Sequence, residues 1–268
     1  MINEVIQGDC LEVMKGIEDK SIDMILTSPP YDNLRDYKGY TFNFEGIAKE
    51  IYRVLKDGGV CVWVVGDATI KGSETGTSFK QALYFKEIGF NLHDTMIYHK
   101  PNAMPLTHNR YDPCFEYMFI FSKGTPRVFN PIREETLHKG KINKRELETK
   151  MIGIKGHQSR NRNEHTVVKE TKYKKNLWSY MVGCDKDKKT NKHPAPFPEK
   201  LAEDHILSWS NEGDTILDPM AGSGTTLKMA KKNNRNYIGI EISPEYIDII
   251  NKRLSQLTED NKDTNPKE

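Results

Sequence analysis

The feature that most constrains the fold is a strand, a glycine turn and a helix start, with a second strand after them. The run TILDPMAGSGTT at 215–226 opens as an apolar strand, turns at Gly222 and Gly224, and continues as a helix from Thr225. A further apolar run, Tyr237–Ile240, ends in Glu241. Two strands joined through a helix favour parallel neighbours in one sheet. The chain is therefore predicted to be α/β.

Apolar strand patterns alternate with helical patterns along most of the 268 residues, without internal repeats. Strands alternating with helices predict a mainly parallel twisted sheet with helices on both faces. Strands are expected at Val5–Gln7, Ile22–Leu26, Val60–Val65, Asn91–His99, Glu116–Phe121, Thr215–Asp218 and Tyr237–Ile240. Helices are expected at Leu11–Gly16, Glu45–Leu55, Thr77–Ile88, Pro198–Ser208, Thr225–Asn233 and Pro244–Leu257. The polar residues Thr258–Glu268 are expected to form a disordered tail.

The glycine turn suits a nucleoside. Gly222 and Gly224 allow the backbone to approach a ligand, and Glu241 ends the next strand, where an acid accepts hydrogen bonds from ribose hydroxyls. The turn lacks the third glycine of dinucleotide sites, and the sequence holds no Gly-Lys-Ser/Thr phosphate loop. A nucleoside without phosphates is the better fit, and S-adenosylmethionine is the common one.

A second motif follows the strand Ile22–Leu26. Ser28-Pro29-Pro30-Tyr31 stops strand pairing, because two prolines fix φ and remove two backbone donors. A hydroxyl, free carbonyls and an aromatic ring at a strand's carboxyl end suit a flat ring with an exocyclic amine. The alternative for this motif alone is an ordinary Pro-Pro turn with a surface tyrosine.

Charge is unevenly distributed. Residues 127–192 hold 18 Lys/Arg and 8 Asp/Glu, a net of 18 − 8 = +10, whereas the whole chain carries +2 and the remainder therefore 2 − 10 = −8. Such asymmetry predicts a phosphate-binding segment on an acidic body, the alternative being a solvated basic loop. The basic residues expected to contact DNA are Lys144, Arg145, Arg160, Arg162, Lys174 and Lys175.

Taken together, these motifs resemble the DNA methyltransferases that modify the exocyclic nitrogen of cytosine or adenine. Ser28-Pro29-Pro30-Tyr31 precedes the glycine turn, a permuted order similar to the family's β group. The resemblance implies a permuted Rossmann-like methyltransferase fold. It divides the chain into a catalytic half (1–126), a basic target-recognition insertion (127–192) and a cofactor half (193–257).

The resemblance also implies roles for individual residues. Gly8-Asp9-Cys10 matches a family segment whose acid reaches the cofactor's adenine amine, and His193–Pro198 matches one that closes over its methionine part. Met220 stands where many relatives have phenylalanine. The implied catalytic residues are Ser28, Pro29, Pro30 and Tyr31. The implied cofactor-binding residues are Asp9, Cys10, Phe197, Pro198, Asp218, Pro219, Met220, Ala221, Gly222, Gly224, Thr225, Glu241 and Ile242.

The implied reaction is direct, in-line methyl transfer from S-adenosylmethionine to a flipped-out base in double-stranded DNA. Ser28 at the first motif position favours the N4 amine of cytosine, with the N6 amine of adenine as the alternative. Two further alternatives are a protein-amide methyltransferase, whose motif begins with Asn and follows the glycine turn, and a catalytically silent DNA-binding relative. A homodimer and a cognate restriction endonuclease stay open as additional partners.

The remaining sequence features point to an enzyme of the bacterial or phage-infected cytoplasm. Four cysteines, Cys10, Cys61, Cys114 and Cys184, stand singly, which argues against structural zinc and for a reducing compartment. No apolar run approaches the length of a membrane span. Pro113-Cys114 resembles the nucleophile of carbon-5 cytosine methyltransferases but precedes the glycine turn, so we expect Cys114 to be structural.

Overall fold

The computed structural model describes residues 2–30, 42–103, 109–137, 142–143, 166–167, 169–183 and 198–263. The chain divides into two compact units. The main unit comprises Met1–Asn130 and Asn176–Glu268, and the inserted unit comprises Pro131–Lys175. The sites expected to bind the cofactor and the base belong to the main unit.

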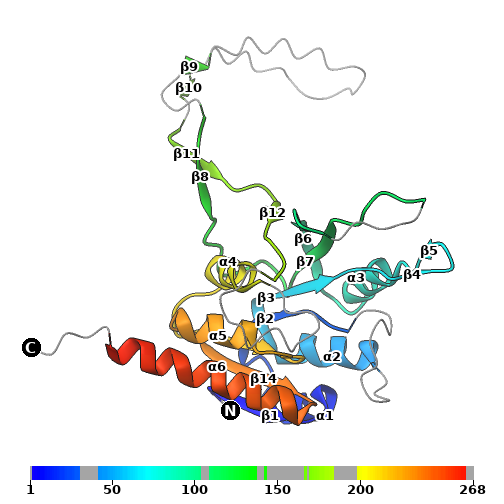
Figure 1. Cartoon of the computed structure of the whole chain (residues 1–268), viewed down its shortest axis with the longest axis vertical. Coiled ribbons are helices and arrows are strands. Elements are labelled where there is room, and N and C mark those ends of the chain that lie inside the picture. The colour runs from blue at the N-terminus through cyan, green and yellow to red at the C-terminus, as the bar shows by residue number, and fades with distance from the viewer. Residues whose placement is uncertain are drawn as a thin grey trace, which may run out of the picture. The chain divides into compact units, whose positions relative to one another are not determined.

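The main unit is built on an eight-stranded sheet with the spatial order β1-β14-β13-β2-β3-β7-β6-β12 (Figure 1). β7 is antiparallel to both of its neighbours, and every other neighbouring pair is parallel. The strands are β1 (Glu4–Gln7), β2 (Ile22–Thr27), β3 (Leu55–Val65), β6 (Asn91–His99), β7 (Phe115–Ser122), β12 (Leu177–Ser179), β13 (Thr215–Asp218) and β14 (Asn236–Glu241). A small hairpin pairs β4 (Thr69–Ile70) with β5 (Ser73–Glu74).

Helices cover both faces of this sheet. The helices α1, α2 and α3 pack over one face and enclose the main hydrophobic core. The helices α4, α5 and α6 pack side by side over the other face (Figure 1). Their bounds are α1 (Cys10–Met14), α2 (Phe44–Val54), α3 (Thr77–Glu87), α4 (Glu199–Trp209), α5 (Thr225–Lys232) and α6 (Pro244–Asp263). The predicted fold class is confirmed.

Local sequence explains why these elements form where they do. Every residue of β2 is buried, as expected for a strand covered on both faces. The Asn43 side chain caps α2 by accepting from Gly46 N at 3.0 Å, and the buried residues of α2 recur at helical spacing. A Cβ at Gly239 of β14 would clash with Leu227 of α5, so glycine there lets the helix lie close to the sheet.

The inserted unit contains two short antiparallel pairs. One pairs β8 (Arg133–Glu135) with β11 (Thr171–Tyr173), and the other pairs β9 (Ile142–Asn143) with β10 (Thr166–Val167). This unit lies within the basic insertion expected at 127–192 but is narrower than it. The strand β12, which the sequence pattern did not predict, follows the unit and joins the main sheet beside β6.

Two boundaries differ from expectation. The helix α6 continues past Leu257 to Asp263, so the first part of the predicted disordered tail is helical, because polar residues without proline or glycine do not end a helix. The strand β3 begins at Leu55, inside the expected helix, and Lys56–Gly59 belong to the strand. Among the described residues, no helix is long and apolar enough to cross a membrane, and no cluster of metal-ligating side chains occurs.

Candidate active site at the carboxyl edge of the sheet

The two sequence motifs meet at the centre of the sheet. β2 and β13 are parallel neighbours, so the segments that leave their carboxyl ends start side by side. From β13 the chain returns to the sheet on one side, as β14, and from β2 it returns on the other, as β3. This is a topological switch point, where open α/β sheets leave a crevice for ligands.

A buried hydrogen bond joins the two strand ends. Thr27, the last residue of β2, donates from Oγ1 to Asp218 Oδ1 at 2.8 Å, and Met220 N donates to the same oxygen at 3.1 Å. Burial raises the pKa of Asp218 to about 6, although these donors and the Thr226 hydroxyl act in the opposite direction. Asp218 ends β13 next to the glycine turn and is only 2% exposed, and its contact with the cofactor stays a prediction.

Glu241 holds the glycine turn from the neighbouring strand. Its carboxylate accepts from Gly222 N at 2.8 Å and from Ser243 N at 2.9 Å. Burial raises the pKa of this carboxyl, and the backbone donors partly oppose that rise. Ile242, the next residue, is exposed and presents apolar surface beside the acid. A buried acid next to an exposed apolar side chain suits a ribose and its attached base.

The third acid, Asp9, lies at the end of the neighbouring strand β1. It caps α1 by accepting from Leu11 N at 2.8 Å and Glu12 N at 3.3 Å, both at Oδ1. Gly8 N donates to the carbonyl of Glu241 at 3.0 Å, which links the ends of β1 and β14. Asp9 follows β1, whereas Glu241 and Asp218 are the last residues of β14 and β13. The three acids therefore stand in strand order along one sheet edge, next to the end of β2.

Glycine is required in the turn itself. Gly222 and Gly224 have φ of +51° and +78°, in the left-handed region that favours glycine. A Cβ at Gly224 would lie 2.8 Å from Ile250 Cγ1 of α6, so α6 packs closely against the turn. The turn closes through a hydrogen bond from Gly224 N to Ala221 O at 2.7 Å.

The Ser28-Pro29-Pro30 segment follows β2 directly. Pro29 is buried, and Ser28 and Pro30 are half-buried at the same sheet edge. Tyr31, expected to stack on the base, lies outside the described residues. The start of the motif follows Thr27, whose hydroxyl donates to Asp218, and a shared binding site for the two motifs stays a prediction.

The donor set fits a cationic nucleoside. Within the described part of the chain, Asp218 and Glu241 have hydroxyl and backbone donors but no Lys or Arg partner. A buried carboxylate without a counter-cation favours a positively charged ligand, since an opposite charge restores the ionised form. S-adenosylmethionine carries a sulfonium and an ammonium group on a nucleoside, and so matches both the acids and the glycine turn.

Comparison with known proteins decides the family. A sequence model of the N6/N4 DNA methylase family matches residues 22–252. The chain belongs to this DNA methylase family.

Relatives of this methylase include the orphan methyltransferase M.BamHII of Bacillus amyloliquefaciens, 57% identical over 246 residues, covering 90% of this chain and 91% of the relative. The type II methyltransferase M.BglII of Bacillus subtilis is 26% identical over 270 residues, covering 97% and 71%. Among solved structures, the PvuII cytosine-N4-specific DNA methyltransferase shares the fold, with a TM-score of 0.68 and 22% identity, covering 97% of this chain and 91% of that one.

Membership confirms the predicted family and its cofactor, since S-adenosylmethionine is the methyl donor of these methylases. The individual cofactor contacts of this methylase remain predictions. Pro198 is the N-cap of α4, and Phe197 lies outside the described residues. Cys10, Pro219, Ala221 and Thr225 are buried, whereas Met220 is half-buried against the core. The sequence analysis did not single out Thr27 and Thr226 as hydrogen-bond partners of Asp218. The signal in the sequence was only a threonine at the end of a strand and another at the start of a helix.

Of the residues predicted to contact DNA, Lys174 and Lys175 are described and follow β11 in the inserted unit. Lys175 is exposed and Lys174 half-buried. Nearby, the Arg133 guanidinium lies 4.8 Å from the centre of the exposed Tyr173 ring. Lys144, Arg145, Arg160 and Arg162 lie outside the described residues.

Proposed function

We propose that this methylase transfers a methyl group to the N4 amine of a flipped-out cytosine in double-stranded DNA, directly and without a covalent enzyme intermediate. The observation that supports it is the hydrogen bond between Thr27 and Asp218. That bond fixes the strand end carrying Ser28-Pro29-Pro30 against the strand end that carries the cofactor turn. A base held at the first motif is thereby adjacent to a cofactor held at the second.

The residues of the first motif act on a poor nucleophile. The lone pair of an aryl amine is delocalised into its ring, so the amine reacts slowly unless its geometry is changed. The Ser28 hydroxyl and the Pro29 carbonyl accept from the two N–H bonds, hold the amine pyramidal and stabilise the positive charge that grows on nitrogen. When bound, S-adenosylmethionine supplies an activated methyl group, so the protein contributes alignment and electrostatics.

The base must leave the duplex to reach this edge. Flipping costs a few kcal/mol, which stacking on Tyr31 partly offsets. Ser28 stands where other members of the family have an acid, and serine at that position is commoner among members that modify cytosine. This choice rests on the family resemblance of the motif, and adenine is the alternative outcome of the test.

The inserted unit is proposed to grip DNA phosphates. Exposed Lys172 and Lys175 and the Arg133–Tyr173 stack give it cationic groups next to an aromatic surface. We expect DNA affinity to fall with salt, with a log–log slope of about −0.9 per neutralised phosphate. Lys172→Gln with Lys175→Gln should reduce that slope, whereas Lys15→Gln, at the residue that follows α1 in the main unit, should not.

We place the methylase in the bacterial cytoplasm, encoded by the bacterium or by a phage. The 57% identical relative is named an orphan methyltransferase, which supports action without a cognate endonuclease.

The deciding experiment compares two serines at opposite ends of β2. Duplex DNA is incubated with the full chain and S-adenosylmethionine, digested to nucleosides and analysed by mass spectrometry. Ser28→Ala should slow methyl transfer about 10²–10³-fold, the usual effect of removing one group that stabilises transition-state charge. Ser21→Ala should leave it unchanged, because the Ser21 hydroxyl donates only to the Glu18 carbonyl at the other edge.

N4-methylcytosine is the expected product. N6-methyladenine would replace the cytosine assignment with the adenine alternative. Methylation at cytosine carbon-5, or full activity in Ser28→Ala, would contradict the proposed mechanism.

A further inference from the structure

A buried arginine lies directly beneath the glycine turn. Arg253 on α6 is fully buried, with a side-chain exposure of 0%. Its Nη1 donates to the Ser223 carbonyl at 2.6 Å, and the Ser223 and Thr225 hydroxyls lie 3.3 Å from the same nitrogen. One guanidinium therefore contacts both the middle of the turn and the first residue of α5.

The other end of this guanidinium reaches α4. Arg253 Nη2 donates to Glu199 Oε1 at 2.8 Å, and Lys228 of α5 donates to the same oxygen at 2.6 Å. Glu199 is the first residue of α4 and directly follows Phe197-Pro198, the segment predicted to contact the cofactor's methionine part. Arg253 thus connects the two segments of the chain that the sequence assigns to the cofactor.

The turn needs such support, because its own residues do not cap the helix. α5 begins at the left-handed Gly224 and has no side-chain cap. The Ser223 carbonyl accepts from Arg253 of α6, and the Ile250 side chain of the same helix lies so close to Gly224 that a Cβ there would clash with it. A planar guanidinium presents its N–H donors on separate nitrogens in a fixed fork, so Nη1 can serve the turn while Nη2 serves the carboxylate; the three donors of a lysine all leave one nitrogen.

We propose that Arg253, paired with Glu199, is a positioning residue for cofactor binding. It holds Gly222 N in place against Glu241 and keeps the start of α4 next to the turn. Arg253 itself touches neither base nor cofactor. The inference rests on the cofactor site proposed above, so its test includes a variant of that site.

The test separates positioning from general stabilisation. Arg253→Met removes the guanidinium but keeps an apolar stem, Arg253→Lys retains the charge, and Glu199→Gln removes the partner's charge. Lys231→Met is the matched control, because Lys231 also links α5 to α6, donating to the Leu254 carbonyl at 2.9 Å away from the turn. Each protein is assayed for S-adenosylmethionine affinity by calorimetry, for KM and kcat, and for thermal unfolding.

We expect Arg253→Met to weaken S-adenosylmethionine binding at least about tenfold, as for one lost hydrogen bond to a charged group. KM for the cofactor should rise by a similar factor while kcat at saturation changes less than about threefold. Arg253→Lys should restore part of the affinity. Glu199→Gln should weaken binding in the same direction, and its effect should not add to that of Arg253→Met.

Two outcomes would overturn the inference. The first is wild-type cofactor affinity in folded Arg253→Met and Glu199→Gln proteins. The second is a Lys231→Met protein that loses as much stability as Arg253→Met and also loses as much cofactor affinity. If Arg253→Met does not fold, Glu199→Gln decides by the same affinity measurement. Glu241→Gln separates a failure of the cofactor site from a failure of the role of Arg253, and Glu245→Gln is its control. If Glu241→Gln binds S-adenosylmethionine as tightly as the wild-type protein, the cofactor site itself is contradicted.

Discussion

The two edges of the main sheet differ in whether their buried carboxylates are paired with Lys or Arg. At the amino edge, the Asp23 carboxylate lies 2.7 Å from Lys56 Nζ and 2.9 Å from Arg127 Nη2, and accepts from Thr215 N at 3.0 Å. At the carboxyl edge, Asp218 and Glu241 are equally buried, but within the described chain they accept only from hydroxyls and backbone amides. One edge neutralises its charges internally, and the other does not.

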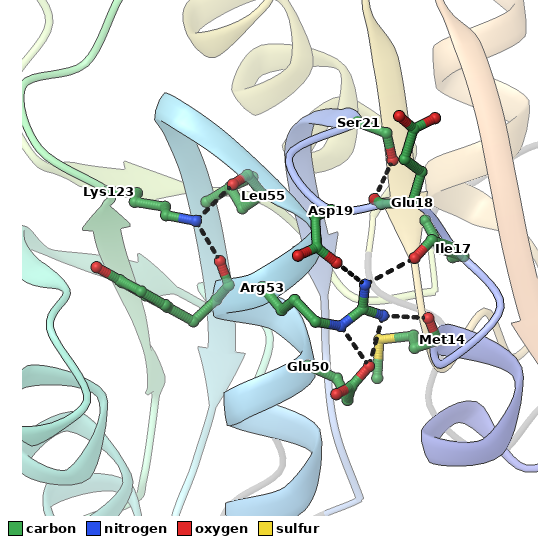
Figure 2. Close-up of polar contacts among 10 residues, drawn as sticks. Met14, Ile17, Glu18, Asp19, Ser21, Glu50, Arg53, Leu55 and Lys123 are labelled. Carbon is green, nitrogen blue, oxygen red and sulfur yellow. Dashed lines mark hydrogen bonds and ion pairs between the residues drawn. The ribbon is translucent and has the colours of Figure 1, made fainter.

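Other contacts at the amino edge follow the same rule. Arg53, at the end of α2, donates to Glu50 and Asp19 and to the carbonyls of Met14 and Ile17, which fastens the connection between α1 and β2 (Figure 2). Lys123 donates to the Leu55 carbonyl at 3.0 Å (Figure 2), and burial lowers its pKa. The charged side chains of Arg53 and Lys123 thus have their hydrogen-bond partners within the chain.

The difference places the unfavourable burial of unpaired carboxylates at the carboxyl edge of the sheet. Two buried carboxylates without a cation reduce the stability of the ligand-free protein, and a cationic ligand would remove that cost on binding. Sites of this kind are where local stability rules are broken for function. The contrast between edges can be tested by removing acids and their partners one at a time.

The largest expected effect is at Asp218. The folded protein keeps this proton up to about pH 6, whereas the ordinary value is 3.8. Ionisation therefore costs the folded state stability, and that stability is lost as pH rises from about 4 to about 6. Asp218→Asn should remove the cost and stabilise the ligand-free protein by up to about 3 kcal/mol at pH 7, but not near pH 3.5, in urea unfolding.

The same variant should bind the cofactor more weakly, so stability and affinity should change in opposite directions. In the wild-type protein, S-adenosylmethionine affinity should fall as pH drops through about 6, and in Asp218→Asn this dependence should be reduced. A variant that is destabilised equally at both pH values would contradict the assignment of the raised pKa to Asp218.

The second effect, at the amino edge, has the opposite sign. Asp23→Ala leaves Thr215 N without its acceptor and Lys56 without its buried partner, and should destabilise the protein by about 2 kcal/mol. Cofactor affinity should stay within about twofold. Glu12→Gln is the control: Glu12 pairs with Lys15 at the surface, and the change in unfolding midpoint should be within error. Weakened cofactor binding in Asp23→Ala would show that the edges are coupled.

The comparison also shows what the sequence could reveal. The strand β6 was predicted at its observed bounds, and the acids that end β13 and β14 were located by their spacing from the glycine turn. These features are local, since an apolar run or a left-handed glycine depends on neighbouring residues. The family and its fold followed from the same motifs.

Long-range partners could not be predicted in this way. Thr27 and Asp218 are 191 residues apart, and Arg253 and Glu199 are 54 apart, so no spacing rule connects them. The strand β12 has only three residues, of which Trp178 alone is buried, and it exists because β6 offers an edge to pair with. Burial of Arg253 was likewise hidden, because a charged residue on a polar helix is usually solvated.

The smallest expected effect is at Thr27, the residue that joins the two motifs. Thr27→Val keeps the side-chain shape but removes the donor to Asp218 Oδ1. Because that hydrogen bond favours the ionised acid, its loss should raise the pKa of Asp218 above about 6, measurable by NMR titration of the carboxyl carbon. Stability should fall by about 1 kcal/mol at pH 8 and by less at pH 5, where the acid is protonated. Thr215→Val makes the same change at the amino end of β13 and should show no such pH dependence. If both variants titrate like the wild-type protein, the hydroxyl of Thr27 does not tune the acid, and the link between the two motifs is steric alone.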